Sequence, residues 1–111
     1  MKTLKIKHLL LATAISLVFV NQAHAYTTYG SYDCGEWVTE SKSTGPMRSW
    51  LLGFLTGLNA MHELSGRNDD PLSKINSAKQ IYVWMDNFCQ KNPLKTVTSG
   101  GVDLFIELMK K

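Results

Sequence analysis

From residue 33 onward, apolar side chains recur at intervals of three and four positions, which is the spacing of one face of an α-helix. No stretch alternates between apolar and polar residues strongly enough to favour a sheet. The expected helices cover residues 33–41, 47–64, 71–90 and a last segment after residue 92. The chain is therefore predicted to be all-α, a small bundle of three to four helices.

Three prolines mark where helices should begin. Pro46 stands at the start of the second helix, since proline suits the first helical position. Asp70 can cap the third helix, with Pro71 in its first turn. Pro93 disfavours the helical state for Asn92, which can then cap the last helix.

Two pairs of glycines interrupt the helical pattern. Gly53 and Gly57 lie four residues apart on one face of the second helix, and each lowers its intrinsic propensity by about 1 kcal/mol relative to alanine. We expect another helix of the same chain to pack closely on that face. Gly100 and Gly101 predict either a kink in the last helix or a close helix–helix contact.

The first 25 residues have the layout of a cleavable signal peptide. Three lysines precede an apolar run over residues 9–20, which is too short to span a bilayer, and a small-x-small motif ends at Ala25. We predict cleavage after Ala25, which leaves residues 26–111 as a single helical domain in the periplasm. A retained N-terminal anchor is the alternative.

The predicted leader also changes how the charge is interpreted. The whole chain carries a formal charge of +3, and the leader contains three lysines and no acidic residue. The exported part is therefore close to neutral, and its lysines and arginines do not cluster. We accordingly expect no nucleic-acid partner, because binding would need a basic face, and no stable membrane insertion after cleavage.

Cys34 and Cys89 are the only cysteines, and both fall in the exported part. An even cysteine count in a small exported domain indicates a disulfide, and two cysteines allow one intramolecular pairing. Two free thiols or an intermolecular bridge are the alternatives. In the chain-entropy model, closing the long loop between Cys34 and Cys89 stabilises the fold by about 4 kcal/mol, which is large for so small a domain.

Candidate catalytic and metal-binding residues are sparse. His62 is the one histidine of the exported part, and we expect it at the surface or at a helix end. The familiar metal sites need three or four converging ligands, and disulfide-bonded cysteines do not serve. No serine lies in a nucleophile-elbow sequence. We therefore predict that the protein is not an enzyme and has no catalytic residue, metal or cofactor.

Aromatic residues and loops are better candidates for function, as contacts for another protein. Exposed tryptophan and tyrosine contribute disproportionately to interfaces, and loops carry function more often than the framework does. The lead-in over residues 26–32 and the polar loop over residues 65–70 are the candidate loops, each with a solvated connector as its alternative. The predicted partner-binding residues are Trp37, Tyr29, Tyr32, Arg67, Asn68 and Asp69.

Several motifs together resemble a known group of proteins. They are Cys34-Gly-Glu-Trp37, Trp50-Leu-Leu-Gly53-Phe-Leu-Thr-Gly57-Leu-Asn59, Trp84-Met-Asp-Asn-Phe-Cys89-Gln-Lys-Asn-Pro93 and the closing Glu107-Leu108. The chain looks like the small periplasmic helical proteins of the HdeA-like type. Within them it is most similar to the immunity proteins of the Rap/Tai type, which protect bacteria from type VI secretion peptidoglycan amidases. The resemblance implies a helical fold with a Cys34–Cys89 disulfide and binding to another periplasmic protein, with a homodimer as one option.

Three functions follow as hypotheses. The first is a non-enzymatic periplasmic binding protein, most concretely an immunity-type inhibitor of a cell-wall hydrolase. The second is an acid-stress chaperone like HdeA and HdeB, in which protonated carboxylates leave the basic residues unopposed and loosen the fold. The glycine-rich second helix departs from those chaperones. The third is an accessory component of an envelope or conjugation apparatus.

Overall fold

The computed structural model describes residues 26–43 and 45–110, and the predicted signal peptide lies outside them. Its elements are α2 (Cys34–Glu40), α3 (Gly45–Leu64), the 3-10 turn η1 (Pro71–Lys74), α4 (Ala78–Lys91) and α5 (Val97–Lys110). These residues contain no strand, and an isolated antiparallel bridge joins Asp33 to Thr96. The predicted all-α fold is confirmed.

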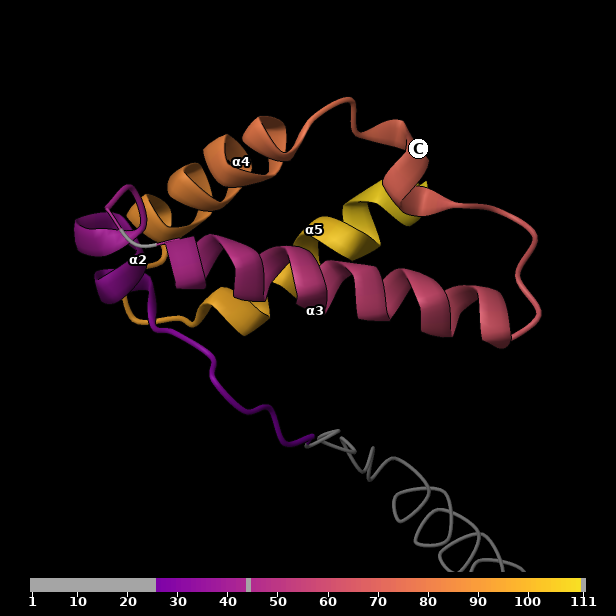
Figure 1. Ribbon diagram of the computed structural model, residues 1–111, viewed down its shortest axis with the longest axis horizontal. Coiled ribbons are helices and arrows are strands. Elements are labelled where there is room, and N and C mark those ends of the chain that lie inside the picture. Colours follow the sequence, from indigo (N-terminus) through magenta and orange to yellow (C-terminus); the bar gives the residue numbers. More distant parts are fainter. Residues whose placement is uncertain (1–25, 44, 111) are drawn as a thin grey trace, which may run out of the picture.

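Helix α3 runs the length of the globule and packs along α5, and α4 packs on α5 as well (Figure 1). Helix α2 packs on α4 at the end where α3 begins, and η1 contacts both α3 and α5. Each helix buries one stripe, which is why the sequence shows the spacing of three and four. The buried apolar residues form one core: Cys34, Trp37, Met47, Leu51, Leu55, Ile81, Met85, Phe88, Cys89, Val97, Leu104, Phe105 and Leu108.

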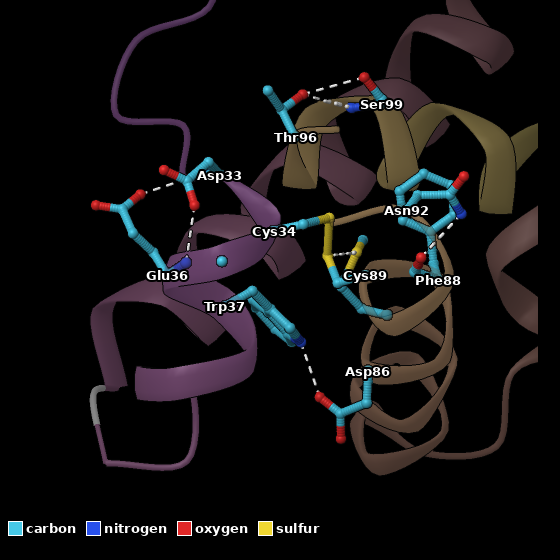
Figure 2. Close-up of a disulfide and its surroundings, with 12 residues drawn as sticks. Asp33, Cys34, Glu36, Trp37, Asp86, Phe88, Cys89, Asn92, Thr96 and Ser99 are labelled. Atoms are coloured by element: carbon cyan, nitrogen blue, oxygen red, sulfur yellow. Dashed lines mark hydrogen bonds between the residues drawn. A yellow bond between two sulfur atoms is a disulfide. The ribbon is translucent and has the colours of Figure 1, made fainter. Parts of the chain in front are cut away.

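Helix α2 begins with a capping box and carries the disulfide. Asp33 Oδ1 accepts from the Glu36 backbone N–H at 2.8 Å, and Glu36 Oε2 accepts from the Asp33 backbone N–H at 3.0 Å (Figure 2). Cys34 follows the cap directly and bonds to Cys89 of α4, with Cα atoms 4.8 Å apart. The predicted intramolecular disulfide is confirmed.

The prediction of one helix over residues 71–90 is wrong in its first part. Only η1 forms there, and the chain is then extended at Ile75 (φ −100°, ψ 127°) and Ser77 (φ −157°, ψ 152°) before α4 begins. Asp70 makes no capping bond, and its carboxylate accepts from the side-chain amide of Asn59 on α3 instead. At the break, side chains take the place of helical backbone bonds: the Asn76 backbone N–H donates to the side chain of Gln80 at 2.8 Å, and the Ser73 hydroxyl donates to the carbonyl of Asp70 at 2.6 Å.

The last helix begins later than predicted. Asn92 ends α4 rather than capping α5, because its backbone N–H and its Nδ2 both donate to the carbonyl of Phe88 at 2.9 Å. After a turn, Thr96 caps α5 by accepting from the backbone N–H of Ser99 at 3.2 Å (Figure 2). Leu94 lies in that turn and is 99% exposed.

The two glycine pairs have opposite surroundings. Gly53 and Gly57 are exposed, and an added Cβ would meet no described atom within 4 Å, so the predicted close packing there is wrong. Gly100 and Gly101 are buried within a continuous helix. A Cβ at Gly100 would lie 2.6 Å from Met85 Sδ, and one at Gly101 would lie 2.9 Å from a ring carbon of α3. This pair therefore makes a close helix–helix contact and not a kink.

Candidate binding surface

The predicted partner-binding residues do not form one site. Tyr29 and Tyr32 lie in the lead-in near the start of α3, whereas Arg67, Asn68 and Asp69 lie in the loop beyond its far end (Figure 1). Because α3 has 20 residues, its two ends are about 30 Å apart. The structure therefore places the two tyrosines in one region and the three loop residues in another.

Trp37 belongs to neither region, because it is not a surface residue. Its side chain is fully buried where α2 packs on α4, and its Nε1–H donates to the carboxylate of Asp86 at 2.8 Å (Figure 2). A buried indole N–H usually has such a partner. The prediction that Trp37 contacts another protein is contradicted by this burial, and the residue belongs to the core.

Hydrogen bonds hold the lead-in against the start of α5. The Val97 backbone N–H donates to the carbonyl of Tyr32 at 2.9 Å. One residue earlier, the hydroxyl of Ser31 bonds to the hydroxyl of Thr98, which is buried. These contacts fix the path of the chain as it enters α2.

Trp50 of α3 holds the lead-in on its other side. The indole Nε1–H donates to the carbonyl of Tyr29 at 2.8 Å. Gly30 follows with a φ of +73°, and a Cβ there would lie 3.3 Å from the indole, so a glycine suits this close approach. The ring of Tyr32 meets Trp50 edge-on at 6.5 Å, and Phe54 stacks on Trp50 at 5.2 Å. The three rings form a row along α3.

A hollow of about 520 Å³ lies beside this row, and we call it the aromatic groove. Its lining residues are Tyr26, Thr27, Thr28, Tyr29, Ser49, Trp50, Gly53 and Phe54. Gly53 keeps it open because no side chain projects from that position. Tyr26 is 61% exposed and Tyr29 is 88% exposed, so both are available to a partner.

A second hollow of about 500 Å³ adjoins the first, and we call it the acidic groove. Its lining residues are Tyr26, Thr28, Ser31, Tyr32, Asp33, Glu36, Thr96, Thr98 and Ser99. The two carboxylates are those of the capping box. Among the described residues, no lysine or arginine lines either groove.

The loop after α3 forms a third hollow of about 530 Å³, lined by Asn59, Glu63, Gly66, Arg67, Asn68, Asp69 and Asp70. His62 donates from Nε2 to Asp69 Oδ1 at 2.8 Å, and this bond is the main reason that the pKa of the Asp69 carboxyl lies below its usual value. The His62 ring packs edge-on against Phe105 of α5 at 5.7 Å, so its side chain is only 7% exposed. His62 therefore lies at a helix end, as predicted, but faces inward and ties the loop to the core.

Two other kinds of site are absent from the described residues. Nowhere in residues 26–43 and 45–110 do three or more histidine, cysteine, aspartate or glutamate side chains converge as metal ligands would. None of the helices in this part of the chain combines the length and the apolar character needed to cross a bilayer. The three hollows offer aromatic contact, hydrogen bonding and, in the acidic groove and the loop hollow, negative charge.

Trp50, Gly53 and Phe54 were not among the predicted binding residues, although the sequence contains a signal for them. Positions four apart are neighbours on a helix surface, so Trp50 and Phe54 form one aromatic pair, and Gly53 leaves the space beside them free. The spacing does not show that the lead-in folds back onto this pair, because that contact joins segments about 20 residues apart.

A scan against protein-family models, a search of curated proteins and a search of solved structures each found no match for this chain. Its class is therefore defined by the structure itself. It is an all-α globule in which a disulfide joins α2 to α4 and the lead-in completes a surface on α3. The resemblance to immunity proteins of the Rap/Tai type stays a prediction.

Proposed function

We propose that this protein is a non-enzymatic binding protein of the periplasm that docks another protein on the aromatic groove. The groove is the observation that carries the proposal, because it gathers exposed Tyr26 and Tyr29 beside half-buried Trp50 and Phe54. A few hot-spot residues supply most of the binding energy at an interface, and tryptophan and tyrosine are enriched among them. They also present large, rigid contact areas that lose little conformational entropy on binding.

The way the lead-in is held also supports a binding role. Its backbone is bonded to Trp50 of α3 through Tyr29 and to Val97 of α5 through Tyr32. The side chain of Tyr29 nevertheless remains exposed. A surface that is already ordered before its partner arrives loses less entropy in the complex, so the affinity is higher for the same contacts.

The most concrete form of the proposal is an immunity-type inhibitor of a cell-wall hydrolase. The motifs described above carry this step, through their resemblance to the Rap/Tai type. A hydrolase gene of the effector type beside the gene for this protein would support it. Inhibition is then a direct measurement: the purified hydrolase should lose activity on peptidoglycan when the oxidised, mature protein is added.

A crosslinking pull-down from native periplasm tests the binding function. Gly53→Leu places a side chain in the aromatic groove, whereas Gly57→Leu places the same side chain on the same face of α3, outside the groove lining. Neither position has a described atom within 4 Å of an added Cβ, so both variants should fold.

We expect the wild type and Gly57→Leu to recover one specific partner, and Gly53→Leu to recover at least about ten-fold less. Recovery of no specific protein by the wild type, or equal recovery by the two variants, would count against docking at the groove.

A second candidate is an acid-activated chaperone, which a different observation favours. Carboxylates connect the helices through buried or half-buried indoles: Asp86 accepts from Trp37 at 2.8 Å, and Glu107 accepts from Trp84 at 3.0 Å. In acid, the loss of negative charge across the exported part leaves its lysines and arginines unopposed, and their mutual repulsion loosens the helices. Aggregation of a client protein at about pH 3, with and without this protein, decides the matter, since an unprotected client removes this candidate.

A further inference from the structure

The aromatic and acidic grooves form one continuous surface, because Tyr26 and Thr28 line both of them. We call the two grooves together the lead-in surface. A partner segment that covers Tyr29 in the aromatic groove therefore has the acidic groove directly beside it.

The lead-in surface carries local negative charge. Asp33 and Glu36 line the acidic groove, and no described lysine or arginine lines either groove. The loop hollow at the far end of α3 also has more carboxylates than cations, but Arg67 lies among them and Asp69 is already paired with His62. Cleavage after Ala25 would place one ammonium group on Tyr26, which still leaves an excess of one negative charge beside the two carboxylates.

The capping box does not use the full acceptor capacity of these carboxylates. It engages Oδ1 of Asp33 and Oε2 of Glu36, and the second oxygen of each takes no part in it. A charge-assisted hydrogen bond to such an oxygen is about twice as strong as a bond between neutral groups. The ring of Tyr26, which is 61% exposed and lines the same groove, can also attract a cation through its face.

Resting on the binding function proposed above, we infer that the partner segment docked on the lead-in surface carries lysine or arginine next to an apolar or aromatic side chain. The cationic group lies in the acidic groove, near Asp33 and Glu36, and the apolar group covers Trp50 and Phe54 in the aromatic groove. An acidic segment would meet like charge there, and an uncharged one would desolvate the carboxylates without pairing them.

Peptide probes test this inference on the mature, oxidised protein. Three synthetic peptides share the same phenylalanine positions and carry lysine, glutamine or glutamate at the remaining variable positions. Fluorescence polarisation should show the lysine peptide binding at least about ten-fold more tightly than the glutamate peptide at about 50 mM salt. The preference should shrink at about 500 mM salt, where exposed charges are screened.

Matched variants then assign the preference to the acidic groove. Asp33→Asn with Glu36→Gln removes both charges but keeps residue types that form the N-cap and the capping box, so α2 should persist. Glu63→Gln with Asp103→Asn removes the same charge from exposed positions outside the lead-in surface. We expect the first double variant to lose the preference for lysine and the second to keep it.

The outcomes separate this inference from the binding function. Equal binding of the three peptides, or no binding of the lysine peptide at about 1 mM, overturns the charge preference. So does an unchanged preference in Asp33→Asn with Glu36→Gln. If Gly53→Leu still lowers recovery in the pull-down in any of these cases, the proposed binding function holds and only the charge preference is rejected.

Discussion

Two pairs of glycines lie on helices α3 and α5, which pack along each other, and their roles are opposite. Gly53 and Gly57 of α3 are exposed to open space, and Gly53 keeps the aromatic groove free of side chains. Gly100 and Gly101 of α5 are buried, and they let that helix approach α4 and α3 more closely than a Cβ would allow. Glycine on a helix therefore marks either an open surface or a close contact, and its neighbours in space decide which.

Leucine in place of one glycine of each pair should give the largest difference in the free energy of unfolding. Gly100→Leu must displace Met85 and Phe88, which are both buried, so the free energy of unfolding should fall by about 3 kcal/mol. Gly57→Leu meets no described atom at its Cβ and gains helix propensity, so the free energy of unfolding should rise by about 0.5–1 kcal/mol. Urea unfolding followed by circular dichroism measures both changes. Two losses of similar size would show that the α3 face is covered after all.

Alanine tests the buried pair with a single methyl group. At Gly100 that methyl carbon would lie 2.8 Å from a ring carbon of Phe88 as well as close to Met85, and we expect a loss of about 1–2 kcal/mol. At Gly101 the nearest atoms belong to the half-buried ring of Phe54, which can shift, so the gain in helix propensity should offset most of the cost. Thermal unfolding ranks the stability of the two variants. A larger loss of stability for alanine at Gly101 than at Gly100 would contradict this ranking.

Alanine on the exposed pair should have a smaller effect of opposite sign. Gly53→Ala and Gly57→Ala should each raise the free energy of unfolding by about 0.5–1 kcal/mol, because alanine restricts the unfolded chain and fits the helix. Urea unfolding at several protein concentrations provides the measurement. A concentration-dependent loss would indicate that a second copy of the chain packs on this face.

The smallest effect on stability is expected away from the glycines, in the loop at the far end of α3. His62 lowers the pKa of Asp69 in the folded state, so the ionised carboxylate stabilises the fold at neutral pH, and this stability is lost as the pH falls through the lowered pKa. Asp69→Asn should therefore be less stable than the wild type at neutral pH, and the two should converge below about pH 4. Because Asp69 is about half exposed, the difference should be small. Glu63→Gln, at an exposed position near the same helix end, is the control, and a constant gap at all pH values would contradict this role.

Part of the fold could be predicted because its signals are local in the chain. The spacing of apolar residues predicted the long helix that became α3, and the two cysteines allowed a single intramolecular pairing. The signals at Asp70 and Asn92 were misleading, because a residue that can cap a helix can also bond elsewhere. Asp70 bonds to Asn59, and Asn92 closes α4.

The candidate site was predictable only in part. The exposed Tyr29 follows from a polar, aromatic lead-in, but the burial of Trp37 and the roles of Trp50 and Gly53 do not. Each of these depends on contact between segments far apart in the sequence, such as the bond from Trp37 to Asp86.

The sequence by itself determined the all-α class and the intramolecular disulfide, since helical periodicity and the number of cysteines are properties of the chain alone. Only the tertiary structure decided which glycines are covered, which tryptophan is buried and where the grooves lie. The physical reason is that burial belongs to a pair of surfaces: a helix shows which face is apolar, but not which other segment will cover it or leave it open.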